Sequence, residues 1–176
     1  MKLIIKCLLG AMCCISFLVI SQDAQNYRLS TDDQISIRVF NEPELTIQNV
    51  KISTNGTIAM PLLGQVDIHN LTVSQAELKL SKLLLDGYLK KPNVTITITE
   101  YRPFYIGGEV NRPGSYPYRK DLTIQKAITI AGGFTSRASE SSISIVNEEE
   151  SRELLQVPFT TKIMPGDVIT VNESFF

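Results

Sequence analysis

The sequence predicts an α+β protein built from two small domains. Three observations indicate this class: stretches in which apolar and polar residues alternate, two stretches with helical spacing, and an Arg102-Pro103 joint between two such groups. Proline biases its predecessor toward extended geometry and cannot donate to a sheet ladder. We therefore expect a first domain over 25–101, with antiparallel strands and one helix, and a second domain over 102–176.

The first group contains four segments with the pattern of strands. They are 34–40 (QISIRVF), 47–53, 57–60 and 94–100 (VTITITE). Asn55-Gly56 tolerates the positive φ angles of a tight hairpin turn. We expect the strands around this turn to pair antiparallel.

Between these strands, the stretch 71–85 changes to a helical period. Thr72, followed three residues later by Gln75, forms a capping-box pattern. The apolar residues behind this cap fall on one helical stripe: Val73, Ala76, Leu80, Leu83 and Leu84. The helix is expected to end near Gly87.

The second group contains five predicted strands. They are 104–110, 115–118, 143–146, 154–157 and 168–171. Pro113-Gly114 suits a type II turn after the first strand, and Pro165-Gly166-Asp167 suits a turn before the last.

A short helix is predicted inside this second group. Thr123 is its expected N-cap, Ile124 and Ala127 begin its apolar face, and Gly132-Gly133 terminates it. A hairpin, a helix and further strands, in this order, are typical of a β-grasp (ubiquitin-like) domain, in which a sheet wraps one helix.

The N-terminus has the pattern of a secretory signal peptide. The basic start MKLIIK precedes an apolar run over 7–20 and then the polar SQDAQN, which predicts cleavage after Ser21, with Ala24 as a second candidate. The run is shorter than the roughly 20 residues of a membrane-spanning helix. We expect the signal peptide to occupy 1–21.

All three cysteines lie inside this leader, so the mature chain is expected to have no disulfide and no thiolate metal site. Lipidation is the less favoured alternative. Met12 precedes Cys13, and Cys13 precedes Cys14, which matches a lipoprotein cleavage site poorly.

Composition and charge disfavour several classes of function. The full chain is 43% apolar and 20% charged, as in an ordinary folded protein, and its net charge is -1. Its dense basic pairs, Lys90-Lys91 and Arg119-Lys120, read as solvated loop charges, so we expect no nucleic-acid partner. No phosphate-binding loop or dinucleotide fingerprint is present in the sequence.

The residues that could carry catalysis are few. The only histidine in the sequence, His69, follows Asp67 and is interpreted as exposed and structurally neutral. Asp32 and Asp33 could be paired carboxylates, but adjacent residues of an extended chain point opposite ways, which favours a role in the turn. The run Glu148 to Glu150 reads as a solvated loop. We expect no catalytic residue, no metal site and no cofactor.

Four tyrosines around the joint and the following hairpin are candidate glycan contacts. Aromatic faces stack on sugar rings, and exposed tyrosines could line a glycan path. Core packing explains the same alternation equally well. The candidates are Tyr101, Tyr105, Tyr116 and Tyr118.

Several segments together resemble a known family. YRLSTDDQISIRVFNEPELT, VKISTNGTIAMPLLGQVDIHNLTVSQAE and YLKKPNVTITITEYR are similar to the polysaccharide export domain of outer-membrane capsule and exopolysaccharide translocons. YIGGEVNRPGSYPYRKDLTIQKAITIAGGFT with MPGDVITV resembles the soluble ligand-binding β-grasp (SLBB) domain that accompanies it. The likeness covers nearly the whole mature chain.

The resemblance assigns structural roles to one set of motif residues: Asp33, Gly56, Pro61, Gly64, Gly108, Pro113, Gly114, Gly132, Gly133, Gly166 and Asp167. One position departs from the family pattern. Family members usually have glycine before the aspartate that opens the first strand, where this chain has Asp32. A locally different turn is expected there.

The resemblance also implies a function. It predicts a non-enzymatic component of a polysaccharide export translocon in the periplasm at the outer membrane. Expected partners are the polysaccharide, further copies in a homo-oligomeric ring, a separate outer-membrane β-barrel and an inner-membrane chain-length regulator. Large members end in an amphipathic helix that forms the outer-membrane pore. This chain stops at Phe176, so we expect a short member that borrows a pore.

Two other functions remain open at this point. A stand-alone periplasmic glycan-binding module would be a monomer with measurable sugar affinity. A glycan hydrolase would depend on Asp32, Asp33 and His69.

Overall fold

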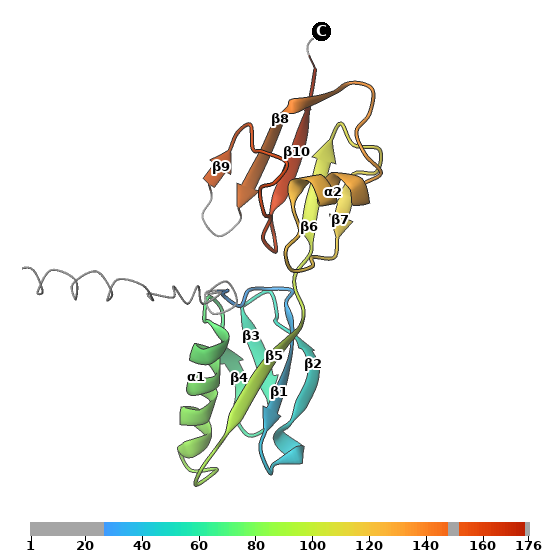
Figure 1. Ribbon diagram of the computed structural model, residues 1–176. Helices are drawn as coiled ribbons and strands as arrows, with labels where there is room; N and C mark the ends of the chain where they lie inside the picture. The colour runs from blue at the N-terminus through green and yellow to red at the C-terminus, as the bar shows by residue number, and fades with distance from the viewer. Residues whose placement is uncertain (1–26, 148–151, 175–176) are drawn as a thin grey trace, which may run out of the picture.

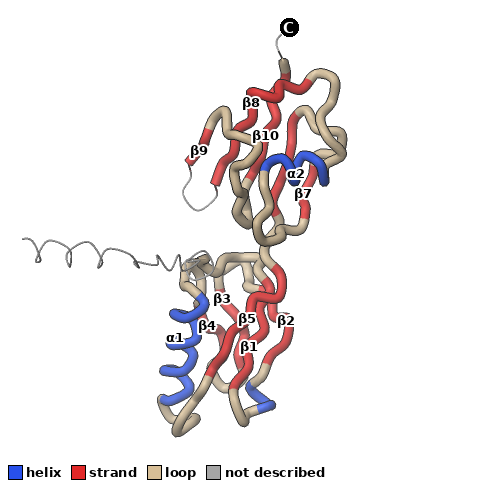
Figure 2. The backbone as a smooth tube through the Cα atoms, viewed as in Figure 1, coloured by secondary structure: helices blue, strands red, loops and turns tan. Residues whose placement is uncertain are grey.

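The computed structural model of the chain describes residues 27–147 and 152–174. The predicted signal peptide and the glutamates at 148–150 lie outside the described residues. The described part is α+β, as predicted, and contains two separate hydrophobic cores. The chain runs from the last strand of one group through Arg102-Pro103 into the first strand of the other (Figures 1 and 2). We call the two groups the first and second domains; their exact limits stay a prediction.

The first domain is built on a three-stranded antiparallel sheet. The strand order is β2-β1-β5. The bounds are β1 (Gln34–Val39), β2 (Ile47–Lys51) and β5 (Val94–Glu100), with a 3-10 turn, η1 (Pro43–Leu45), between β1 and β2. The predicted alternation is confirmed, since Ile35 and Ile37 are fully buried in the centre of this sheet.

The turn at Asn55-Gly56 forms, but the strands on its two sides do not pair with each other. β3 (Thr57–Met60) pairs instead with β4 (Gly64–Asp67) in a separate two-stranded sheet. The Ile52 N–H donates to the Asp33 carbonyl oxygen, which keeps the end of β2 against β1. The predicted pairing across this turn is therefore wrong.

The predicted helix of the first domain is confirmed as α1 (Val73–Leu85). The Thr72 hydroxyl accepts from the Gln75 N–H, and the Gln75 side chain accepts from the Thr72 N–H, which completes the capping box. Ala76, Leu80 and Leu84 are buried, whereas Leu83 lies at the edge of the stripe and stays exposed. The helix lies alongside β5 (Figure 1).

The second domain is a β-grasp fold, as predicted. Its five-stranded sheet has the order β7-β6-β10-β8-β9, in which β6 and β10 are parallel and the other neighbours are antiparallel. The strands are β6 (Phe104–Gly108), β7 (Gly114–Tyr116), β8 (Ala138–Asn147), β9 (Arg152–Leu154) and β10 (Val168–Glu173).

One face of this sheet is covered by α2 (Ile124–Ile130) (Figure 1). The Thr123 hydroxyl accepts from the Lys126 N–H, which confirms the predicted cap. Phe104 and Ile124 are fully buried between helix and sheet. The Gly133 N–H donates to the Ile128 carbonyl oxygen after the last turn, as expected for a helix end.

All five strands of the second domain differ in their bounds from the prediction; β7 ends at Tyr116 rather than at Tyr118, and β10 continues to Glu173 rather than ending at Val171. β6 ends at Gly108, where φ turns positive, rather than at Val110. β8 begins at Ala138 rather than at Ile143. Its first half is polar and has no apolar alternation, so the sequence pattern did not predict it. The described part of β9 ends at Leu154 rather than at Val157.

Among the residues that the structure describes, no helix combines the length and the apolar character needed to cross a membrane.

Candidate functional site

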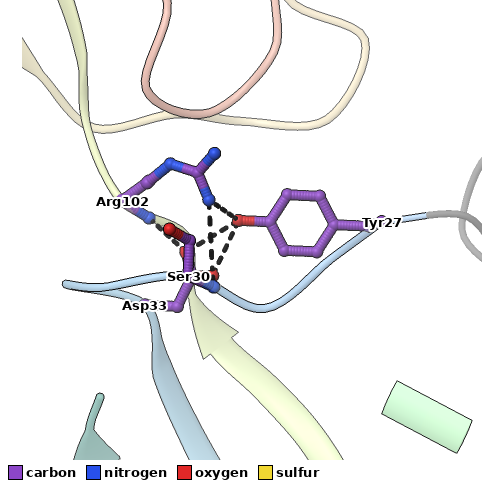
Figure 3. A network of polar contacts seen from close by, with 4 residues as sticks. All are labelled: Tyr27, Ser30, Asp33 and Arg102. Atoms are coloured by element: carbon purple, nitrogen blue, oxygen red, sulfur yellow. Dashed lines mark hydrogen bonds and ion pairs between the residues drawn. The ribbon is translucent and has the colours of Figure 1, made fainter. Parts of the chain in front are cut away.

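A buried carboxylate lies at the end of the first domain that faces the joint (Figure 3). The Asp33 side chain is fully buried and precedes β1. Its Oδ2 accepts from the Ser30 N–H at 2.9 Å, and its Oδ1 accepts from the Arg102 N–H at 2.8 Å. The Tyr27 hydroxyl lies 2.7 and 2.8 Å from the two oxygens and donates to them. Asp33 therefore ties the segment that precedes β1 to the segment that follows β5.

Arg102 joins the two domains through this carboxylate. Its guanidinium donates to the Tyr27 hydroxyl oxygen at 2.9 Å and lies 3.7 Å from Asp33 Oδ2. Only 4% of Arg102 is exposed, and the guanidinium carbon lies 5.7 Å from the centre of the Tyr27 ring. We call Tyr27, Ser30, Asp33 and Arg102 the joint network (Figure 3).

Burial and hydrogen bonding act on Asp33 in opposite directions. Burial raises the pKa of Asp33, while the bonds from Ser30, Arg102 and Tyr27 and the charge of Arg102 lower it; the net shift is upward. Burying a carboxylate costs free energy unless hydrogen-bond donors satisfy its oxygens. The contacts of the joint network are therefore those of a structural element.

Two of the four candidate tyrosines extend this network. Tyr101 meets Tyr27 edge to face at 5.0 Å and Tyr118 at 5.4 Å between ring centroids. Burial raises the pKa of both Tyr101 and Tyr118. Because Tyr118 belongs to the second domain, this row of rings packs the domains together at the joint.

The other two tyrosines lie elsewhere. Tyr116 stacks on Phe104 at 5.9 Å, and its hydroxyl donates to the Arg112 carbonyl oxygen, so it is held against the second core. Tyr105 is 44% exposed on β6. The structure thus brings Tyr101 and Tyr118 together and places Tyr105 on another face.

Tyr105 is part of an apolar row beside a cleft between the domains. In the sheet register, Val168 of β10 is the neighbour of both Tyr105 on β6 and Val146 on β8. The three side chains alternate with buried residues and so point away from α2, and each is about two-fifths exposed. The cleft of about 230 Å³ is completed by Thr31, Asp32, Arg102, Pro103 and Gly166.

An exposed aromatic ring beside charged side chains can bind a sugar. The ring face of Tyr105 offers stacking area, and the exposed carboxylate of Asp32 in the same cleft wall can accept hydrogen bonds from hydroxyls. Sequence patterns pointed to Tyr105 but not to Val146, Val168, Tyr27 or Arg102. Arg102 and Asp33 are separated by 69 residues, and no local pattern links them.

The glycines assigned to the family motif stand at turns. Positive φ angles occur at Gly56, Gly64, Gly108, Gly132, Gly133 and Gly166. Pro61 and Pro113 are exposed next to turns, and Gly114 begins β7. At Gly56 a Cβ atom would lie 2.4 Å from the Cβ of His69, so that histidine packs over the turn.

Asp167 closes the turn before β10. The carboxylate is 2% exposed and accepts from the Met164 N–H and the Asn147 side-chain amide. The motif residues are therefore spread over separate turns rather than gathered in one pocket.

The carboxylates and the histidine considered for catalysis are also separate. Asp32 is exposed and forms an ion pair with Lys51 at 2.8 Å, whereas Asp33 is buried. Asp67 accepts from the His69 backbone N–H. Within 27–147 and 152–174, no group of three His, Cys, Asp or Glu side chains could hold a metal ion.

Asp32 occupies a left-handed backbone conformation, with a φ of 70°. This explains why glycine suits the position in the family pattern, since a Cβ atom costs about 1 kcal/mol there. We expect the free energy of unfolding of the Asp32→Ala variant to be about 1 kcal/mol lower than that of the Asp32→Gly variant. Both variants lose the ion pair with Lys51, so chemical denaturation of the two compares the backbone alone. Equal stabilities would contradict this explanation.

Comparison with family models finds two matches along the chain. A model described as polysaccharide biosynthesis/export protein matches residues 21–99, and a model of the SLBB domain matches residues 103–156. The two matches meet at the Arg102-Pro103 joint.

Three known proteins are similar to this chain. The exopolysaccharide production protein ExoF of Rhizobium meliloti is 29% identical over 121 residues, which are 62% of this chain and 29% of that protein. The EPS I polysaccharide export outer membrane protein EpsA of Ralstonia nicotianae is 26% identical over 144 residues, 68% of this chain and 38% of that protein. EpsA of Ralstonia solanacearum is 24% identical over 160 residues, 77% of this chain and 42% of that protein. The chain thus spans less than half the length of each of these relatives.

Proposed function

The chain belongs to the polysaccharide biosynthesis/export protein family, and from this premise we propose that it is a non-enzymatic component of an envelope translocon for capsular polysaccharide or exopolysaccharide. The observation that carries the proposal is the order of two modules, an export domain and then an SLBB domain. The names of the similar proteins support the same role, since two are polysaccharide export outer membrane proteins and one is an exopolysaccharide production protein.

The joint network supports a passive, shape-determining role. Asp33, Arg102 and Tyr27 fix the start of the second domain against the first through buried hydrogen bonds. A chain with a fixed joint presents the same surfaces in every copy, which is what a ring requires. We propose that copies form or cap a periplasmic conduit, between an inner-membrane chain-length regulator and a separate outer-membrane β-barrel.

Deleting the gene in its bacterial host tests this function. Surface and secreted polysaccharide should be lost, while polymer synthesis continues, because export and not assembly of the chain fails. The measurement is the amount of polysaccharide outside and inside the cells, with the gene restored on a plasmid as control. A deletion strain with normal surface polymer would refute the proposal.

A stand-alone periplasmic glycan-binding module is the second candidate function. The apolar row of Tyr105, Val146 and Val168 beside the inter-domain cleft favours it, because such a surface can bind a sugar ring by itself. The two functions differ in assembly. Light scattering after gel filtration should give a monomer for the binding module and a large particle for the translocon component.

A further inference from the structure

A second concave surface lies on the second domain, along the exposed side of α2. The loop before the helix contributes Arg119, Lys120 and Asp121, and the helix contributes Gln125, Lys126 and Thr129. We call this surface, with a volume of about 480 Å³, the α2 groove. It is distinct from the cleft at the joint, which lies on the opposite face of the sheet.

Positive charge is concentrated at the α2 groove. Among the residues that line it, three are cationic and one, Asp121, is acidic. Asp121 is held by the Lys162 ammonium at 2.9 Å, and this ion pair lowers the pKa of Asp121, with smaller effects from Lys120 and Lys126. Lys162 therefore offsets the carboxylate and leaves an excess of three positive charges, although the full chain carries a net charge of -1.

Folding brings these charges together from separate segments. Arg119 and Lys120 form an adjacent pair in the sequence, but Lys126 lies in the first turn of α2 and Lys162 comes from the segment paired with Thr123. The Lys126 ammonium donates to the Asp121 carbonyl oxygen, which fixes the helix charge beside the loop charges. The pair that reads as solvated loop charge in the sequence is thus one side of a larger basic surface.

The other lining groups suit a hydroxylated ligand. Gln125 and Thr129 are exposed beside Lys126 and offer amide and hydroxyl groups, and Ile130 adds an exposed apolar side chain. Sugar rings combine hydroxyls with weakly polar faces, and acidic sugars add carboxylates that Lys and Arg bind. The combination matches an acidic polysaccharide better than it matches a purely anionic or a neutral polymer.

Resting on the export role proposed above, we propose that the α2 groove binds the exported polymer and that this polymer is acidic, with carboxylate-bearing sugars such as uronic acids. Arg119, Lys120 and Lys126 bind the carboxylates, and Gln125 and Thr129 bind ring hydroxyls. Contacts of this kind are exposed and individually weak, so they suit a polymer that must move along the surface.

Binding of a uronic acid oligomer to the purified mature chain tests the proposal. Calorimetry should detect binding of oligogalacturonate that weakens as salt is raised, and much weaker binding of the fully methyl-esterified oligomer of equal length. The Arg119→Gln/Lys120→Gln/Lys126→Gln variant should bind the acidic oligomer about tenfold more weakly or worse. The Lys90→Gln/Lys91→Gln variant is the control, because it removes an exposed basic pair of the first domain.

Several results would overturn the proposal. They are the absence of measurable oligogalacturonate binding, equal binding of the methyl ester, an unchanged affinity in the triple variant, or an equal loss in the control variant. Tighter binding of an oligoglutamate with the same number of charges would assign the groove to an acidic protein segment instead. The methyl-ester comparison uses the native sequence and so does not depend on how the variants fold.

This test can fail separately from the export role. A deletion strain with normal surface polysaccharide would refute the translocon function, whatever the purified chain binds. If the triple variant loses binding of the acidic oligomer but restores export fully in the deletion strain, the α2 groove does not bind the exported polymer, and the translocon function still stands.

Discussion

Replacing Asp33 with alanine is expected to lower the free energy of unfolding of the first domain by about 3 to 5 kcal/mol. The substitution leaves the N–H groups of Ser30 and Arg102 and the Tyr27 hydroxyl without this acceptor, and it removes the carboxylate that forms an ion pair with the buried Arg102 guanidinium. A buried donor that loses its acceptor costs about 1 to 3 kcal/mol, and a buried unpaired charge costs more. The loss is therefore large although the side chain is small.

Hydrogen exchange measured by mass spectrometry can locate this effect. The two cores are separate, so exchange should increase most in the first domain and around Arg102, and less in the second core around Phe104. Asp32→Gly is the matched control, because it removes the neighbouring but exposed carboxylate. If Asp33→Ala changed exchange no more than Asp32→Gly, the joint network would not be a stabilising element.

The same substitution should also affect export. Arg102 orients the start of the second domain through Asp33, so an altered joint would misplace the surfaces that copies use to assemble. We expect the strain with Asp33→Ala to export much less polymer than the strain with Asp32→Gly at equal protein level. This consequence depends on the proposed translocon function, whereas the loss of stability does not.

The regular elements of this fold could be predicted from local sequence patterns. Strict alternation in VTITITE gave β5 with its observed bounds, and the Thr72–Gln75 pattern gave the start of α1. These patterns depend on neighbours in the sequence. The pairing of β3 was predicted wrongly because β4, which begins only four residues after β3 ends, was not predicted as a strand, and β3 pairs with it instead of with β2.

The candidate sites could be predicted only in part, because their residues come from segments far apart in the sequence. Tyr105 stood out as an aromatic residue in an alternating strand, but its partners in the cleft come from β8, β10 and the joint. From the sequence, Arg102 is predicted only as part of the joint between the domains, whereas in the structure it contacts Asp33. The positive charge at the α2 groove comes from residues within 119–126 and from Lys162, so no single segment of the sequence predicts it.

Gly108 lies where two backbone segments of the second domain come closest. Its φ is +78°, and a Cβ atom there would lie 2.1 Å from the Val171 carbonyl oxygen, which is backbone and cannot rotate away. That oxygen accepts from the Glu109 N–H, and β6 and β10 pair in register up to this point. The parallel pairing at the centre of the sheet therefore needs glycine at this position.

Gly108→Ala is accordingly expected to lower the free energy of unfolding of the second domain by about 3 kcal/mol, since the left-handed conformation and the overpacked backbone each add about 1 to 2 kcal/mol. Gly107→Ala is the control on the same strand, because its added Cβ atom would meet nothing within 4 Å and its φ is not in the left-handed range. The control should change the free energy by less than about 0.5 kcal/mol. Chemical denaturation followed by circular dichroism compares the two, and a Gly108 variant as stable as the Gly107 variant would show that the sheet can open at this end without loss.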